Sequence, residues 1–435
     1  MTIPKMRWVI AGMLFLATAV NYADRLALSL VSVAKDFQAE VVMDDVGYSW
    51  VVAAFFLAYA IMYAGSGYIV DRLGTKRGFA FFIGLWSVAA MLHAFAWNTV
   101  SFGACRFLLG LGEPGNWPAA AKAVSEWFSA KQRALGVGIF NAGSSIGSAL
   151  APPAVWWLTS HFGWRAAFVG VGAVGLVWLV LWLVLYEPPH HNRFLRREEY
   201  LEFKDDVLPP EQTQGAPAEK VAWSKVVRTR ACVAVSIARA LTDPVMYFVI
   251  FWLPKYLEKE RHFDLAMVGK YSWVPFVFGG IGYTVGGWLS GWLIGRGWGL
   301  LNARKVAMLI GAACLPVAIA APHVPTAALA IAATCFLTLG HGFWVANLQT
   351  LPTDLFPGYE VGTVSGFSGM GGSLVGMVAN LGTGYVVSRF SYSPVFLVAG
   401  LMHPTAMVII HLMLKGDRDR EVKVGPTLGA SVGRA

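Results

Sequence analysis

Long apolar stretches with almost no charged residues recur along the whole chain of 435 residues. A helix needs about 20 apolar residues to cross the hydrocarbon layer of a membrane. Hydrophobic residues make up 56% of the chain and charged residues only 14%, against about 25% charged in an ordinary globular protein. Since so few charges cannot cover the surface of a water-soluble fold of this size, the sequence predicts a polytopic membrane protein and excludes a soluble enzyme.

The apolar stretches predict an all-α fold of twelve transmembrane helices. The first stretch follows two cations and resembles a signal peptide, but no cleavage site of small residues follows it, so we expect an uncleaved first span. The predicted spans are 8–30, 47–70, 78–97, 100–123, 134–159, 164–186, 229–256, 266–295, 304–321, 325–349, 360–388 and 393–414.

One long polar segment, residues 187–228, divides these spans into two sets of six. It contains two proline pairs and much of the clustered charge, which is typical of a linker. We therefore expect a six-helix N-terminal half (1–186), a cytoplasmic linker, a six-helix C-terminal half (229–414) and a cytoplasmic tail (415–435). Two such halves would face each other around a central cavity.

The short connections carry most of their cations on one side of the membrane. The positive-inside rule assigns that side, and both termini, to the cytoplasm. These cations are Arg72, Lys76, Arg77, Lys131, Arg133, Arg304, Lys305, Lys415, Arg418, Arg420 and Lys423. One connection on the opposite side also carries cations, at Lys255, Lys259, Arg261 and Lys270. We attribute the net charge of +9 to membrane topology and expect no nucleic-acid partner.

Four cysteines lie far apart in apolar stretches, at Cys105, Cys232, Cys314 and Cys335. Their spacing fits neither a disulfide framework nor a metal site. The sequence contains no nucleophile–base motif and no phosphate-binding loop. We therefore expect a protein that is not an enzyme and that needs no metal or other cofactor. A membrane-embedded solute sensor is the alternative from a different class.

Six charged residues lie inside the predicted spans, where each costs about 2.5–3.5 kcal/mol at the bilayer centre. They are Asp24, Arg25, Arg106, Glu113, Arg239 and Asp243. The two in the fourth span are seven residues apart and share one helix face, and the two in the seventh are four apart and can pair directly. We expect these side chains to face one another or a wet cavity; the alternative is that they only hold helices together.

Three cations and three anions make this set neutral when no solute is bound. An anionic solute would leave an uncompensated negative charge at low dielectric, and protonation of one carboxylate would restore neutrality. The charges therefore predict that an anion and a proton travel together. Asp24 and Glu113 are the candidate proton carriers, because burial favours the neutral form of a carboxyl group. Arg25 is the candidate ligand for a carboxylate, which guanidinium binds through two parallel hydrogen bonds.

The connection after the second predicted span has the sequence GYIVDRLGTKRG over residues 67–78. Its glycines permit a tight turn and close helix approach. The segment resembles the signature loop of the major facilitator superfamily; the alternative is a generic turn rich in cations. The resemblance implies that Asp71 and Arg72 act in gating and do not bind substrate. The corresponding segment of the second half, 287–296, lacks the acidic residue.

Further segments resemble the anion:cation symporter family, and within it the sugar-acid branch that includes hexuronate and galactonate transporters. These segments are 21–25, 106–118, 126–128, 140–147, 163–165, 239–247 and 252–256. The resemblance covers nearly the whole chain. It implies the major facilitator fold and proton-driven uptake of a sugar acid across the bacterial inner membrane. We expect the carrier to be a monomer.

The resemblance also implies roles for single residues. Arg25 matches the arginine that holds the substrate carboxylate. Asp24 and Glu113 match the protonatable pair, and Arg106 matches the partner of Glu113. The candidate substrate contacts are Arg25, Tyr22, Tyr59, Asn141, Ser144, Arg239 and Asn347. Each of the hydroxyl and amide side chains could instead form only a hydrogen bond between helices.

Arg239 departs from the pattern, because galactonate carriers place an amide side chain at this position. The departure favours a hexuronate such as galacturonate or glucuronate as the substrate. The alternatives within the same fold are galactonate, glucarate or an aromatic acid.

Overall fold

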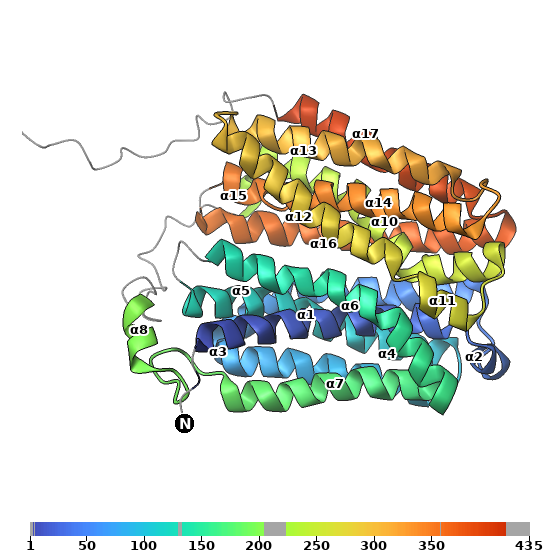
Figure 1. The fold of residues 1–435 in the computed structure, drawn as a ribbon, viewed down its shortest axis with the longest axis horizontal. Coiled ribbons are helices and arrows are strands. Elements are labelled where there is room, and N and C mark those ends of the chain that lie inside the picture. The colour runs from blue at the N-terminus through green and yellow to red at the C-terminus, as the bar shows by residue number, and fades with distance from the viewer. Residues whose placement is uncertain (1–2, 4, 129–132, 204–222, 357, 415–435) are drawn as a thin grey trace, which may run out of the picture.

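The structure is a computed structural model that describes residues 3, 5–128, 133–203, 223–356 and 358–414 (Figure 1). Long helices run side by side along the long axis of the molecule. Part of the predicted linker, the whole predicted tail and five of the cations used for orientation lie outside the described residues. Those cations are Lys131, Lys415, Arg418, Arg420 and Lys423.

The helices before the linker form one bundle, which fills the lower part of Figure 1. They are α1 (Met6–Val31), α2 (Lys35–Glu40), α3 (Asp45–Leu92), η1 (His93–Phe95), α4 (Thr99–Gly112), η2 (Glu113–Gly115), α5 (Asn116–Trp127), α6 (Arg133–Phe162) and α7 (Trp164–Leu185). The short helices α8 (Arg197–Phe203) and α9 (Trp223–Val226) follow in the linker region.

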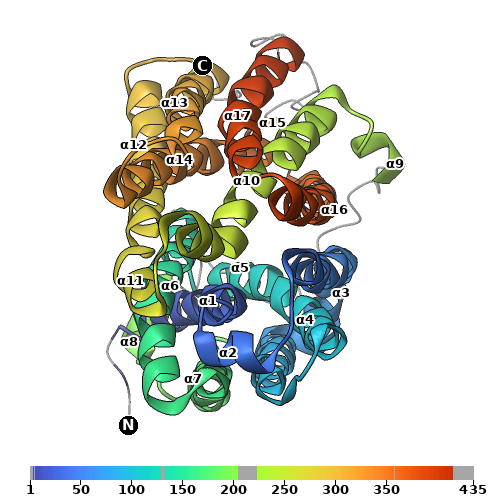
Figure 2. The same ribbon diagram turned by 90° about the vertical axis from the view of Figure 1, so that its right-hand side faces the viewer.

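The helices after the linker form the second bundle, as Figure 2 shows from the end of the molecule. They are α10 (Arg230–Arg261), α11 (Leu265–Tyr271), α12 (Val274–Gly295), α13 (Leu300–Cys314), η3 (Leu315–Ala320), α14 (Ala327–Leu348), α15 (Leu351–Leu355), α16 (Gly358–Arg389) and α17 (Ser393–Met413). Each predicted span therefore coincides with a helix, which confirms the all-α fold class.

Two predicted spans are joined in the single long helix α3, which is kinked at Gly74. This residue has φ 77° and ψ 159°, a backbone conformation that residues with a Cβ atom rarely adopt. The chain reverses direction there, and a Cβ atom on Gly78 would lie 2.9 Å from Cα of Val70. The glycines of the 67–78 segment thus form the tight turn that the sequence predicts.

Among the described residues, nine helical segments are long and apolar enough to cross a membrane. Three predicted spans do not meet that measure. Span 100–123 is interrupted by η2, where Pro114 follows Glu113. Helices α6 and α12 are rich in glycine and other residues of low hydropathy. All three segments lie within the bundles. The helix interruption in one, and the small residues of the other two, explain why they miss the length or the hydropathy expected of a membrane span.

Helix α1 is held backbone to backbone against α6. A Cβ atom added to Gly143 would lie 2.2 Å from the carbonyl oxygen of Phe15, and one added to Gly147 would lie 2.1 Å from that of Ala19. No larger residue fits at either position without moving a helix. This contact fixes the position of α1, which carries Asp24 and Arg25.

Replacing Gly147 with alanine should therefore destabilise the protein by about 1–3 kcal/mol, the usual cost of overpacking. The measurement is the apparent melting temperature of the detergent-solubilised protein. Gly138 on the same helix has no atom within 4 Å of an added Cβ, so Gly138→Ala should leave the melting temperature unchanged or slightly higher. Equal effects of the two substitutions would contradict the close approach of α1 and α6.

Candidate functional site

Arg25 of α1 and Glu113 of η2 form a buried ion pair in the N-terminal half. The Nε and Nη2 atoms of Arg25 both donate to Oε2 of Glu113, at 2.9 and 2.5 Å. The two side chains are 4% and 0% exposed. Glu113 reaches Arg25 from the helix interruption at Pro114, where the turn packs tightly against the Phe82 ring. The guanidinium that could bind a substrate carboxylate is therefore occupied by a carboxylate of the protein.

Arg106 makes no hydrogen bond with Glu113 among the described residues. Its Nη1 atom donates to the backbone carbonyl of Arg25 at 3.3 Å, while Nε and Nη2 have no hydrogen-bond partner in the described part of the chain. The charges of Arg106 and Glu113 nevertheless act on each other, so the partnership of these two residues stays a prediction.

Asp24 is buried beside this pair, and both of its carboxylate oxygens lack a hydrogen-bond partner among the described residues. The charges of Glu113 and Arg106 act on it. An ionised carboxylate without hydrogen bonds is far more costly to bury than a neutral acid. The environment of Asp24 is thus that of a group suited to carrying a proton in this conformation.

Aromatic rings surround the Arg25 guanidinium. The Cζ atom of Arg25 lies 4.8 Å from the ring centroid of Tyr22, 5.4 Å from that of Phe55 and 5.1 Å from that of Tyr59. These distances allow cation–π attraction. The Tyr59 hydroxyl also accepts a hydrogen bond from Nε1 of Trp117 at 2.9 Å. The guanidinium is therefore enclosed by rings of α1 and α3 in addition to its contact with Glu113.

A second ion pair lies on α10 in the C-terminal half, where Arg239 and Asp243 pair directly, as their spacing allows. Nε of Arg239 donates to Oδ2 of Asp243 at 3.1 Å, and the side chains are 13% and 12% exposed. Nη1 of Arg239 reaches α16, at 3.4 Å from both the Ser365 carbonyl and the Ser368 hydroxyl. Gly372 of α16 leaves room for the carboxylate, since an added Cβ would lie 2.5 Å from it.

Tyr22 of the N-terminal half and Tyr247 of the C-terminal half each lie close enough to both ion pairs to be affected by their charges. Tyr247, one helical turn after Asp243, packs its ring against Phe56 of α3 with centroids 4.6 Å apart. The charges of Asp243, Arg239 and Arg25 all act on the Tyr247 hydroxyl, and those of Arg25, Glu113 and Asp243 all act on Tyr22. The two ion pairs therefore share one electrostatic environment at the interface of the halves.

The predicted amide and hydroxyl contacts differ in their surroundings. Among the described residues, the side chains of Asn141 and Ser144 donate to carbonyls of their own helix, α6, and to no other group. Asn347 is fully buried and donates from Nδ2 to the carbonyls of Phe343 and Gly286, at 2.8 and 3.1 Å. In this conformation Asn347 joins α14 to α12, which is the alternative role for such residues.

The predicted gating residues lie at the turn within α3. Asp71 forms an ion pair with Lys122 of α5, with 2.7 Å between Oδ1 and Nζ. Nη1 of Arg72 donates to the hydroxyl of Tyr68 at 3.1 Å. Both contacts lie within the N-terminal half. The Asp71–Lys122 pair connects α3 to α5 and the Arg72–Tyr68 contact lies within α3, so neither of these contacts reaches the C-terminal half.

The sequence analysis missed an ion triad that joins the halves, formed by Asp45, Lys255 and Lys259. Oδ1 of Asp45 lies 3.3 Å from Nζ of Lys255, and Oδ2 lies 2.5 Å from Nζ of Lys259. Asp45 and Lys255 are buried. The available signal was the connection with cations on the unexpected side of the membrane, because cations that contradict a topology rule need another partner.

All interhalf hydrogen bonds and ion pairs between described residues lie near this triad. The others join Gln38 to Glu258, Ser29 to the Ile250 carbonyl, Tyr48 to the Phe251 carbonyl, and Asn380 to the Ser49 carbonyl. In Figure 1 this is the end with α2 and α11, opposite the N-terminus and α8. Between the described residues, polar contacts thus join the halves at this end and not at the other.

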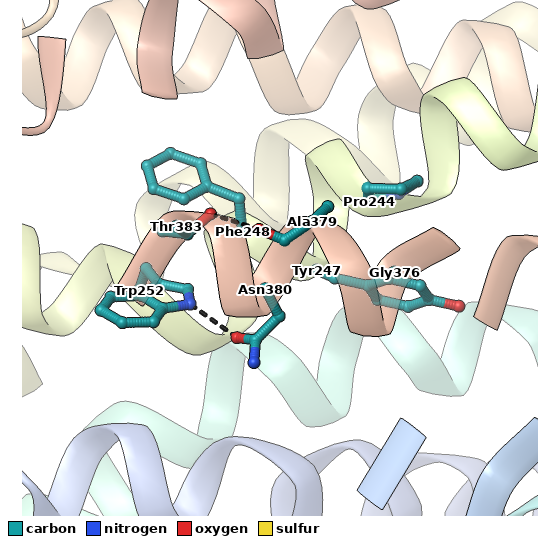
Figure 3. A pocket seen from close by; sticks show the side chains of 8 residues that line it. All are labelled: Pro244, Tyr247, Phe248, Trp252, Gly376, Ala379, Asn380 and Thr383. Carbon is teal, nitrogen blue, oxygen red and sulfur yellow. Dashed lines mark hydrogen bonds between the residues drawn. The ribbon is translucent and has the colours of Figure 1, made fainter. Parts of the chain in front are cut away.

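A small pocket between α10 and α16 lies close to these contacts (Figure 3). Tyr247, Trp252, Asn380 and Thr383 are among its lining residues. Nε1 of Trp252 donates to Oδ1 of Asn380 at 2.8 Å. The cavity volume of about 10 Å³ suffices for roughly one water molecule. It is too small for a sugar acid.

Comparison with known proteins gives one family and several relatives. The model of the Major Facilitator Superfamily matches residues 14–380. A "Hexuronate transporter" of Escherichia coli (strain K12) is 30% identical over 423 residues, which cover 96% of each chain. A "Probable galactarate/D-glucarate transporter GudP" of the same organism is also 30% identical, over 441 residues that cover 97% of this chain and 96% of the relative.

A solved structure shares the fold. It is a bacterial homologue of the human lysosomal transporter Spinster in an inward-facing and unoccupied conformation, with a TM-score of 0.70 and 20% identity. The match covers 94% of this chain and 96% of that chain. The two curated relatives are equally similar to this chain but differ in their named substrates, so the choice of substrate rests on the site.

Proposed function

Because the chain belongs to the Major Facilitator Superfamily, we propose that it is a proton-coupled symporter that imports a sugar acid, and specifically a hexuronate, across the bacterial inner membrane. Relatives that span nearly the whole chain are named as sugar-acid transporters. A membrane protein of this family is a transporter and not an enzyme. The observation that carries the proposal is the Arg25–Glu113 ion pair.

This ion pair couples the solute to the proton by competition. Guanidinium binds a carboxylate through two parallel hydrogen bonds, and Oε2 of Glu113 occupies the edge of the Arg25 guanidinium formed by Nε and Nη2. Protonation of Glu113 removes the charge that holds it to Arg25, and the substrate then takes its place. When the substrate leaves, Glu113 loses its proton and the pair re-forms. Asp24, buried without hydrogen bonds, is the second group that carries protons.

The ion triad is proposed to close the outer gate. We place both termini in the cytoplasm from the positive-inside rule, and on that placement the end that holds the interhalf contacts faces the outside. The halves then rock about the site between the two ion pairs. Asp71 and Arg72 are proposed to stabilise the opposite, inner gate when that end closes.

Replacing Asp45 with asparagine should open this outer end. The substitution leaves the buried Lys255 without its counter-ion, and loss of one partner of a buried pair costs about 3–5 kcal/mol. The ratio of molecules with separated outer ends to molecules with closed ones should therefore rise by at least about 100-fold. Electron–electron distance measurements between spin labels at two exposed positions, 39 on α2 and 260 on α10, would detect it.

Glu258→Gln provides the control for this experiment. Glu258 accepts from Gln38 across the same interface, but the contact is exposed, so its loss should have little effect. An unchanged distance distribution in Asp45→Asn would exclude the triad as a gate.

Substrate-dependent proton flux in proteoliposomes tests the proposed function itself. Addition of galacturonate or glucuronate should acidify the lumen of vesicles that contain the protein and leave empty vesicles unchanged. Thermal-shift measurements with galacturonate, glucuronate, galactonate, gluconate and glucarate would rank the substrates. Binding without proton flux would indicate a sensor and contradict the proposal.

A further inference from the structure

We infer that the Arg239–Asp243 ion pair binds the hydroxyl groups of the substrate, and that Asp243 excludes sugar diacids from the site. This inference rests on the proposed function, since it concerns the end of a sugar acid that lies away from its carboxylate. It assigns the substrate class by charge: acids with one carboxylate pass, and aldarates, which carry a carboxylate at both ends, do not.

The pair has free hydrogen-bonding capacity on both partners. Asp243 uses Oδ2 for Arg239, and Arg239 uses Nε and Nη1. Within the described ranges, Oδ1 of Asp243 and Nη2 of Arg239 have no hydrogen-bond partner. Both side chains keep about an eighth of their surface exposed. A hydroxyl group both donates and accepts, so an open acceptor beside an open donor suits neighbouring hydroxyls of a sugar.

The two ion pairs differ in what surrounds their carboxylates. Glu113 acts on a second buried acid, Asp24, and on two arginines, Arg25 and Arg106. Asp243 faces one cation, Arg239, and no second carboxylate among the described groups acts on it. Within the described part of the chain, the carboxylate of Asp243 is instead hydrogen-bonded to Arg239 alone, at 3.1 Å, outside the cluster that exchanges protons. On this inference the pair stays ionised, and neutral overall, through the cycle.

Charge counting then gives the selectivity. Protonation of Glu113 frees one positive charge, that of Arg25, and one substrate carboxylate neutralises it. The second carboxylate of an aldarate would lie near Arg239 and therefore also near the Asp243 carboxylate. Two neighbouring negative charges repel each other strongly where little water is present. A proton on Asp24 lies in the N-terminal cluster and would not remove this repulsion; a proton on Asp243 would. The end of a hexuronate away from its carboxylate carries uncharged hydroxyl and aldehyde or hemiacetal groups, which the Asp243 carboxylate does not repel.

The test compares galacturonate with galactarate, which share a carbon skeleton and differ only at C1. In the wild-type protein we expect galactarate to bind at least about tenfold more weakly than galacturonate. Asp243→Asn removes the negative charge and leaves Arg239 uncompensated, so the ratio should shift at least about tenfold towards galactarate. Ligand-induced thermal stabilisation of the purified protein gives both affinities without requiring transport, and counterflow in proteoliposomes gives the transport ratio.

Asp354→Asn is the matched control. Asp354 pairs with Arg304 in the same half, at 3.0 Å from Nε and with both side chains 16% exposed. This pair closely resembles Arg239–Asp243, but it joins α13 to α15 away from the tyrosines of the site. Its loss should leave the ratio of the two affinities unchanged.

The outcomes separate this inference from the proposed function. Wild-type protein that binds galactarate as tightly as galacturonate would overturn the inference while sugar-acid transport stands. The inference would also be overturned if Asp243→Asn weakened the binding of galacturonate and galactarate by the same factor. If Asp243→Asn does not fold, Asp243→Ser removes the same charge, and the wild-type ratio by itself already tests the exclusion. Wild-type protein that binds neither acid would overturn both proposals.

Discussion

Substitution of Arg25 by alanine is expected to lower the affinity for a sugar acid by at least about 100-fold and to abolish uptake at micromolar substrate. Arg25 is 4% exposed and ringed by aromatic side chains, so its charge acts at low dielectric. Loss of one partner of such a buried, hydrogen-bonded charge pair costs about 3–5 kcal/mol, and about 1.4 kcal/mol corresponds to a factor of ten. Equilibrium binding to purified protein provides the measurement.

Arg165→Ala is the control for this change. Arg165 pairs with Glu40 on the same half, but the two side chains are 49% and 47% exposed, and exposed ion pairs contribute about 0–1 kcal/mol. Binding should therefore be unchanged. Retention of affinity by Arg25→Ala would remove the carboxylate ligand from the proposed mechanism.

Substitution of Glu113 by glutamine is expected to abolish accumulation against a gradient while exchange of substrate between the two sides continues. Glutamine has the shape of the protonated acid and carries no charge, so Arg25 would remain free at every pH. Substrate binding by the wild-type protein should weaken as pH rises, because Glu113 then reclaims Arg25, and binding by Glu113→Gln should depend much less on pH. Counterflow and proton-driven uptake in the same proteoliposomes measure the two activities.

Glu40→Gln makes the same chemical change at the exposed pair and should alter neither activity. Normal uphill uptake by Glu113→Gln would refute the coupling of proton and solute through this carboxyl group.

The helices and the buried charges could be predicted from the sequence because the membrane restricts both. Every predicted span is helical, since backbone groups in lipid must be satisfied within the helix. The pairing of Arg239 with Asp243 followed from a four-residue spacing on one helix. The contact of Glu113 with Arg25 could not be derived in this way, because it joins η2 to α1 across 88 residues and no spacing within one helix relates the two positions.

Contacts between the halves were beyond the sequence for a related reason. Asp45 meets Lys255 and Lys259 from 210 and 214 residues away, and no periodicity connects such positions. The sequence did show that the connection with Lys255 and Lys259 carries cations on the side of the membrane where the positive-inside rule expects few. The fully buried Asn347 illustrates a different difficulty. From the sequence, a buried amide side chain can equally bind a substrate or form a hydrogen bond between helices.

The tight contact of α1 with α6 determines how the site can move. Where Gly143 and Gly147 meet the carbonyls of Phe15 and Ala19, one helix cannot slide along the other without a steric clash. Arg25 must then travel as part of a block that includes the whole of α6. The guanidinium therefore changes its side of access together with this pair of helices, and the partner exchanged at it is Glu113 of the same half or the substrate.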